Sequence, residues 1–275
     1  MKYIYLNIAV FLPLLCWSQT SLKGRIVDAE TQQGLQYVNI GIIDNGIGTV
    51  SNSNGNFQLE IKEALYKETL RISSIGYETL NGTVEDYLIK LKKNPTLSLK
   101  TELSTLEEVV LSNKPKKRKR IGNKYVFGLV TMVQNSPQLG NEIGSVIKVK
   151  NKITYLEKFS AGISVNSYGK VKFRLKIYNL KEGRPNVSIL KDNIIIETNV
   201  KKGRLTIDLK PYNLVMEEDF FVSLELIDKP ENKKGGIFYS AGFIGADCYF
   251  RQASQDLWTK SIANANISLV MTVKQ

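Results

Sequence analysis

The chain has 275 residues, of which 43% are hydrophobic, enough for one large domain or two small ones. Lys and Arg outnumber Asp and Glu by 38 to 26, a formal net charge of +12, and the chain contains two cysteines and no histidine. The missing histidine excludes Ser-His-Asp and Cys-His catalysis and imidazole metal ligands, and two cysteines cannot form a four-thiolate zinc site, so we expect no metal site and no cofactor.

Residues 1–18 have the composition of a secretion signal. Lys2 precedes an almost wholly apolar run over residues 3–15, which is shorter than the ~20 residues of a membrane span. We expect cleavage after Ser18, which leaves a mature chain without a transmembrane segment in the periplasm, on the outer membrane or outside the cell. The alternatives are acylation of Cys16, although Leu15 stands where a small residue is usual, and a buried N-terminal element.

Cleavage at that point removes one of the two cysteines and leaves Cys248. An intrachain disulfide is then excluded. A single thiol in an oxidising compartment is safest when buried, and the neighbouring Tyr249 and Phe250 are apolar enough for that. We therefore expect Cys248 to lie in a core.

After the signal, apolar residues recur mainly with a period of two, which is typical of strands with one buried face. The clearest runs cover residues 171–178, 205–209, 220–226 and 267–273, with glycine- and asparagine-rich turn signals between such segments. Long helical periodicity is absent, and residues 62–66 are expected to form at most one turn. The sequence predicts an all-β chain of two tandem β-sandwiches.

A basic run separates the two halves. Seven basic residues and no acidic one lie between Lys114 and Lys124. Like charges repel, so residues 112–124 are expected to form an extended, solvated linker. Nucleic acid is not an expected partner, because the protein is predicted to be exported and the run has no interleaved aromatic residues. Contact with an anionic membrane surface is the alternative role.

Four motifs occur in order in the first half, at residues 22–28 (LKGRIVD), 35–40 (LQYVNI), 48–57 (GTVSNSNGNF) and 70–77 (LRISSIGY). Together they resemble the carboxypeptidase regulatory-like domain, which is common in exported proteins of Bacteroidetes-type bacteria. The resemblance implies a small transthyretin/prealbumin-like β-sandwich over residues 19–111. It carries no catalytic site to a chain without histidine. Asn52 stands where the family commonly has aspartate, which weakens any expectation of calcium.

Residues inside these motifs are interpreted as determinants of the fold. Gly55 suits a turn with positive φ, and Phe57 is expected to enter the core. Gly76 is expected to let the backbone pass closely beneath the ring of Tyr77. Ser73, Ser74 and Tyr77 lack a base that would activate a serine, so we do not expect them to be catalytic.

The second half carries weaker motifs. Residues 106–111 (LEEVVL) resemble a segment that follows this domain in TonB-dependent transporters, where it meets a partner by strand addition; a last strand or a linker is the expected role here. Residues 125–275 resemble the jelly-roll-like β-sandwich that follows the domain in small exported proteins. The supporting motifs are at residues 140–144 (GNEIG), 171–178 (VKFRLKIY), 208–212 (DLKPY) and 257–260 (LWTK).

Candidate binding residues are Arg251 and Trp258. They flank a polar stretch, residues 252–256, that is expected to lie at the rim of the second sandwich, where loops often carry function. The alternative is that Trp258 plugs the core and Arg251 lies over it in a cation–π contact. The acidic cluster at residues 217–219 is expected to be the solvated start of a strand.

These observations favour a non-enzymatic exported module that binds or assembles in the cell envelope, with an envelope glycan or an outer-membrane protein as partner. The alternative is a glycan-directed envelope hydrolase that uses Asp and Glu carboxylates alone. A convergent pair of carboxylates in a cleft would favour the hydrolase, whereas a groove without such a pair would favour the binding module.

Overall fold

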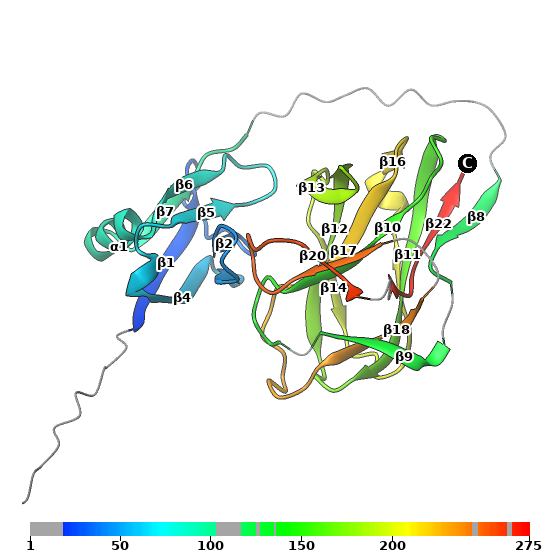
Figure 1. Cartoon of the computed structure of the whole chain (residues 1–275). Helices are drawn as coiled ribbons and strands as arrows, with labels where there is room; N and C mark the ends of the chain where they lie inside the picture. The colour runs from blue at the N-terminus through cyan, green and yellow to red at the C-terminus, as the bar shows by residue number, and fades with distance from the viewer. Residues whose placement is uncertain (1–18, 103–116, 125–126, 135, 244–246, 263–265) are drawn as a thin grey trace, which may run out of the picture.

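The computed structural model of the chain describes residues 19–102, 117–124, 127–134, 136–243, 247–262 and 266–275. Strands dominate these residues, as the sequence predicts, and they form two domains that lie side by side (Figure 1). The predicted signal peptide and the 106–111 segment lie outside the described residues.

The first domain is a sandwich of a three-stranded sheet, β4-β1-β7, and a four-stranded sheet, β3-β2-β5-β6, within the described ranges. Every second residue of β4 points into the core, namely Phe57, Leu59 and Ile61. The burial of Phe57 is as expected. The elements are β1 (Gln19–Asp28), β2 (Asn39–Ile42), β3 (Gly48–Val50), β4 (Asn56–Lys62), η1 (Glu63–Leu65), β5 (Thr69–Ser73), β6 (Leu80–Thr83), α1 (Val84–Lys93) and β7 (Thr96–Leu99).

The helix α1 was not expected from the sequence, whereas the single turn η1 was. The helix begins at a capping box in which Thr83 and Asp86 bond each other's backbone amides. It buries Val84, Tyr87 and Leu91, which lie on one face. The helix also carries Leu88 and Ile89, and Ile89 is 52% exposed, so its apolar residues do not mark one clear face in the sequence. Packing against the sandwich stabilises the helix instead.

Two glycines of the family motifs have different reasons for being glycine. Gly55 has a φ of +83°, as expected, and its turn is closed by the Asn52 side chain, which accepts the amides of Asn54 and Asn56. Gly76 has a φ of +79°, and a Cβ built there would meet no atom within 4 Å beyond its two chain neighbours. The positive φ is what requires Gly76, and the close passage of the backbone beneath the Tyr77 ring stays a prediction.

The second domain contains two larger sheets in the part of the chain that is described. One is seven-stranded, with the order β13-β12-β17-β10-β19-β20 and β14 paired to β12; the other is eight-stranded and is built around β18, β11 and β22. The strands are β8 (Arg118–Gly122), β9 (Phe127–Gln134), β10 (Glu142–Ile147), β11 (Thr154–Asn166), β12 (Val171–Lys181), β13 (Arg184–Ser188), β14 (Ile194–Thr198), β15 (Gly203–Asp208), β16 (Val215–Met216), β17 (Phe220–Leu226), β18 (Ile237–Gly242), β19 (Cys248–Arg251), β20 (Thr259–Lys260), β21 (Asn266–Ile267) and β22 (Leu269–Lys274), with the turn η2 (Lys210–Tyr212).

Part of the predicted basic linker is an edge strand. Residues 118–122 form β8, which pairs antiparallel with β22. Arg118 donates to the Glu157 carboxylate at 2.7 Å. The basic side chains at 118–120 are exposed, as expected, but their backbone is paired rather than free, which corrects the extended-linker interpretation for these residues.

Strands β12 and β17 are buried on both faces, whereas the period-two pattern predicted one solvated face. Arg174 and Lys176 of β12 are 1% and 7% exposed, and Glu225 of β17 is fully buried. The first domain covers this face of the seven-stranded sheet: Asn39 of β2 donates a hydrogen bond to Glu225 and accepts one from Arg174. The polar half of each alternation therefore faces another domain instead of water.

The loop of residues 252–257 fits into a slot between the domains. Gly41 and Gly48 are cross-strand partners on β2 and β3, and a Cβ on either would lie 2.1 or 2.5 Å from the Ser254 carbonyl oxygen. The loop is held further by two backbone amides, since Asp44 donates to the Gln255 carbonyl and Gly46 to the Asp256 carboxylate. The absence of a side chain at Gly41 and Gly48 is what lets the two domains meet.

We predict that Gly41→Ala loosens the domains without unfolding them, because the added methyl clashes with backbone that cannot rotate away. The amides of Asp44 and Gly46 should then exchange with solvent at least tenfold faster, measured by hydrogen-exchange NMR. Gly82→Ala is the matched control, since its Cβ meets only the movable ring of Tyr87 at 3.0 Å. Unchanged exchange in Gly41→Ala would contradict the role of the slot.

Candidate functional site

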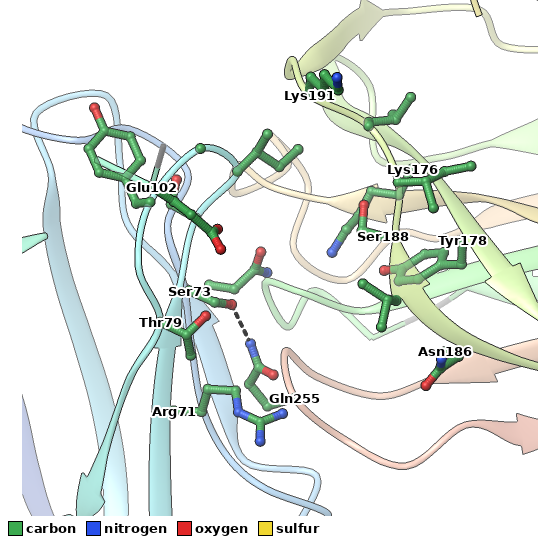
Figure 2. Close-up of a pocket in the computed structure, with 18 of the residues that line it drawn as sticks. Arg71, Ser73, Thr79, Glu102, Lys176, Tyr178, Asn186, Ser188, Lys191 and Gln255 are labelled. Carbon is green, nitrogen blue, oxygen red and sulfur yellow. Dashed lines mark hydrogen bonds between the residues drawn. The ribbon is translucent and has the colours of Figure 1, made fainter. Parts of the chain in front are cut away.

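A cleft of about 830 Å³ lies between the domains. One wall comes from β5 and the segment 74–81 of the first domain, and the other from β12, β13 and residues 189–191 of the second (Figure 2). Arg251 and Gln255 also line it, and Gln255 donates to the Ser73 hydroxyl at 2.8 Å across the interface. The volume falls in the range of small-molecule sites.

The side chains that line the cleft are mainly polar and carry an excess of positive charge. Arg71 belongs to the first-domain wall, Lys176 and Lys191 to the second-domain wall, and Arg251 to β19, whereas Glu102 is the acidic residue among the lining side chains. Arg71 is oriented by a bond to the Asn81 side chain at 3.0 Å. The cleft is therefore suited to a polar ligand with negative charge.

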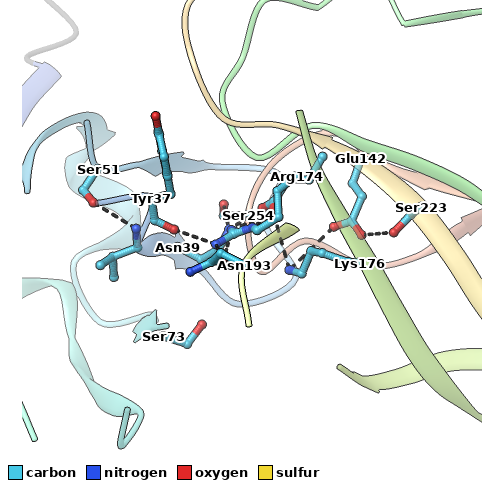
Figure 3. A network of polar contacts seen from close by, with 12 residues as sticks. Tyr37, Asn39, Ser51, Ser73, Glu142, Arg174, Lys176, Asn193, Ser223 and Ser254 are labelled. Carbon is cyan, nitrogen blue, oxygen red and sulfur yellow. Dashed lines mark hydrogen bonds and ion pairs between the residues drawn. The ribbon is translucent and has the colours of Figure 1, made fainter. Parts of the chain in front are cut away.

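Behind the cleft, the guanidinium of Arg174 joins the two domains (Figure 3). Nε and Nη2 contact the Glu225 carboxylate at 2.8 and 2.6 Å. Nη1 donates to the Tyr37 carbonyl at 2.8 Å and to the Asn193 side chain at 3.0 Å, and Nη2 donates to the Asn39 side chain at 2.6 Å. Two of these acceptors belong to the first domain.

Asn39 completes the contact between the domains. Its side-chain amide donates to Glu225 and, at 2.8 Å, to the Ser254 hydroxyl. The oxygen and both amide hydrogens of Asn39 are thus engaged, and each partner belongs to the second domain. A buried polar group with every bond made stabilises one arrangement and disfavours others.

A second carboxylate, Glu142, lies beside the first. Glu142 and Glu225 are register partners on β10 and β17, and Arg251 is the partner of Glu142 on β19. Arg251 donates to Glu142 from Nε at 3.0 Å and from Nη2 at 2.5 Å, and Tyr178 and Ser223 donate to the same carboxylate. Opposite charges thus lie directly across neighbouring strands.

Electrostatics fix the ionisation of Glu225. Burial alone would raise its pKa, but the charges of Arg174 and Lys176 outweigh burial and lower that pKa to about 2. Glu225 is therefore ionised at neutral pH.

Lys176 is the least well stabilised charge of the group. Burial lowers its pKa from 10.5 to about 8, even though Glu225 and Glu142 favour its charged form. Its ammonium lies 3.6 Å from Glu225 and 3.9 Å from Glu142, beyond hydrogen-bond distance. At neutral pH it is a buried cation that its neighbours stabilise only in part.

The two candidate residues from the sequence lie at this site but within the protein's own packing. Arg251 is 8% exposed, and its guanidinium lies 4.8 Å from the centre of the Trp258 ring. Trp258 is half-buried, with its ring centre 5.5 Å from that of Tyr178 and 5.0 Å from that of Phe221. This is the arrangement of the alternative interpretation, in which Trp258 packs in the core and Arg251 lies over it in a cation–π contact. A binding role for Arg251 remains a prediction, since Arg251 lines the cleft.

Other candidates from the sequence lie elsewhere. Glu217 and Glu218 are exposed, and Asp219 accepts the amides of Val149 and Lys150, as a strand start would. Cys248 is buried, as expected, and burial raises its pKa to about 12.

Searches of the described part of the chain gave two negative findings. No group of acidic or cysteine side chains there is arranged to hold a metal ion. No helix in the same residues is long and apolar enough to cross a membrane.

The sequence did not reveal Glu142, Arg174, Lys176 or Glu225 as site residues. They occupy the polar positions of period-two strands, which ordinarily face water. The available signal was an arginine and a lysine on one strand and single glutamates on two others, and only the strand register shows that these lie opposite each other. Ser73 and Tyr77, which the sequence assigned to the fold, also line the cleft.

We predict that Lys176→Met stabilises the protein at pH 7, by about 1–2 kcal/mol, because it removes a poorly stabilised buried cation. The folded pKa of about 8 lies below the unfolded value of 10.5, so the cost of the charge is complete below pH 8 and disappears as pH rises to 10.5. The gain measured by urea unfolding should therefore shrink between pH 7 and pH 10.

Arg174→Met is the contrasting variant for that experiment. It leaves Glu225 buried with its main partner missing and should lose about 3–5 kcal/mol. Destabilisation of similar size in both variants would show that Lys176 is an ordinary member of the ion-pair network.

Comparison with known proteins places the first domain. Residues 22–111 match the family model of the CarboxypepD_reg-like domain. No curated protein matches the chain. Two solved structures are similar at 9% identity: the cysteine protease and lectin-like domains of Cwp84, a surface-layer-associated protein of Clostridium difficile (TM-score 0.43), and the clostridial cysteine protease Cwp84 after propeptide cleavage (TM-score 0.42).

The first of these matches covers 83% of this chain and 46% of the solved chain, and the second covers 92% and 70%. The chain thus spans about half the length of the first structure. The four motifs, the two-sheet sandwich and the family match agree over the same residues. Residues 22–111 are a CarboxypepD_reg-like domain.

Proposed function

We propose that the protein is a non-enzymatic, exported binding module of the cell envelope, and that its ligand occupies the cleft between the two domains. The observation that supports this most is the way the cleft is built. Its walls are sheets from two different domains, and the buried Arg174 and Asn39 hold those sheets together. Pre-organised walls reduce the entropy lost when a ligand binds.

The chemistry of the carboxylates supports binding over the alternative, a glycan-directed hydrolase. Such a hydrolase needs one protonated and one ionised carboxyl group across a cleft. Glu142 and Glu225 lie close together, but both are fully buried and each is bound by an arginine. Glu225, with a pKa of about 2, is unsuited to donate a proton near neutral pH.

The proposed location rests on residues 1–18 of the sequence and on the resemblance of both halves to exported proteins of Bacteroidetes-type bacteria, with residues 125–275 as a jelly-roll-like partner domain. An envelope glycan or an outer-membrane protein is the partner class this implies. Protein recovered from the envelope should begin at Gln19 when its N-terminus is sequenced; a cytoplasmic protein that begins at Met1 would contradict export.

We predict that glycan-containing envelope material protects the walls of the cleft, residues 71–81 and 186–191, from hydrogen exchange measured by mass spectrometry on the mature chain. Thr79→Trp should abolish this protection, because Thr79 is exposed and lines the cleft. Thr131→Trp is the matched control, since Thr131 is exposed on β9 of the other sheet. Protection that survives Thr79→Trp would contradict the proposed site, and release of reducing sugars would favour the hydrolase.

A further inference from the structure

The buried charges behind the cleft do not balance. Arg174, Lys176 and Arg251 supply three cations, whereas Glu142 and Glu225 supply two carboxylates, and all five are at least 92% buried. Tyr178, the other titratable side chain in contact with them, is neutral, because burial raises its pKa well above 10. One positive charge is therefore left over, and an uncompensated buried charge is costly.

The uncompensated positive charge faces the cleft. Lys176 and Arg251 both line it, whereas Arg174 is directed to the first domain. Arg251 uses Nε and Nη2 on Glu142 and Tyr178, and its Nη1 makes no hydrogen bond to the residues that the structure describes. Together with the ammonium of Lys176, which has no carboxylate within hydrogen-bond distance, this provides donors for a bound anion.

The other side chains that line the cleft suit a ligand that carries hydroxyl groups. Both walls present short hydroxyl and amide side chains, which both donate and accept: Ser74, Thr79, Asn81, Asn186, Ser188 and Gln255. The Ser188 hydroxyl oxygen is buried and has no hydrogen-bond partner among the described residues. Val187 and Ile189 are 58% and 37% exposed beside them and offer apolar contact for the C–H face of a sugar ring.

From these observations we propose that the cleft binds an acidic carbohydrate, a sugar that carries a carboxylate, with the carboxylate at Lys176 and Arg251 and the sugar hydroxyls on the neutral side chains. The inference rests on the proposed function and names the ligand class of that site. A carboxylate carries one negative charge, which equals the surplus in the buried group. A phosphate monoester carries about two at neutral pH and would overcompensate it.

The groups that face Lys176 set how binding depends on pH. They are Glu142 on β10, Glu225 on β17, Arg251 on β19, and Arg174 and Tyr178 on β12. A bound carboxylate favours the charged ammonium, so binding takes up a proton when the free lysine is partly neutral. Uronate affinity should then fall as pH rises from 7 to 10.

The experiment is calorimetric titration of the mature chain with a tetrasaccharide of galacturonic acid, with maltotetraose as the neutral match and inorganic phosphate as the bare anion. At pH 7 the uronate should bind at least tenfold more tightly than maltotetraose or phosphate. Lys176→Met should lose at least tenfold in uronate affinity and most of the pH dependence. Urea unfolding of the same variant shows that any loss is not caused by misfolding.

Lys158→Met is the control, because Lys158 is an exposed cation on β11 of the other sheet and does not line the cleft. It should weaken uronate less than threefold and retain the pH dependence. Three results would overturn the proposal: no uronate binding, equal binding of maltotetraose or phosphate, or uronate binding unchanged in Lys176→Met. If the cleft is protected by envelope material but uronate does not bind, the ligand class is wrong while the binding module stands.

Discussion

The four hydrogen bonds of Arg174 and its ion pair with Glu225 are the constraint on which the rest of the structure depends. A guanidinium that is 1% exposed needs acceptors within the protein, and here they come from Glu225 on β17, from Asn193, and from Tyr37 and Asn39 of the other domain. Tyr37 offers its carbonyl from a left-handed conformation, with φ of 58°, which is rare for a bulky residue and costs ~1–3 kcal/mol. Such a geometry persists because the partners on both sides fix it.

The same constraint gives the cleft its positively charged wall. Once Arg174 and Asn39 bring β2 against the seven-stranded sheet, Arg174 and Lys176 of β12 are buried. Glu142, Lys176 and Arg251 must then satisfy one another, and they do so incompletely, which leaves a cation at the wall of the cleft. The loop after β19 adds to this, because the Ser254 carbonyl fits over Gly41 and Gly48 and the Gln255 side chain spans the interface. Structure, electrostatics and proposed function thus follow from one interface.

Much of the fold was predictable from local pattern. The strands at residues 171–178 and 220–226, the burial of Phe57 and Cys248 and the positive φ of Gly55 follow from periodicity, hydrophobicity and turn chemistry. The helix α1 was missed because it is short and only three of its five apolar residues are buried, so tertiary packing rather than a clear period stabilises it. The site was missed for a different reason. Lys176 and Glu225 look solvated in sequence, and neither strand register nor docking of a second domain is encoded in a local pattern. Arg251 was identified because it ends a strand before the polar stretch 252–256 and Trp258, whereas its buried partner Glu142 was not.

The central claim is that the two domains form one rigid unit held by Arg174 and Asn39. Double electron–electron resonance tests it most directly, with spin labels at Lys92→Cys on α1 and Lys158→Cys on β11, both exposed positions. Cys248 is buried and should stay unlabelled. If Arg174 and Asn39 hold the domains rigidly, one narrow distance distribution is expected, and it should broaden when Asn39→Ala is added. A broad or multiple distribution without Asn39→Ala would show that the domains move independently.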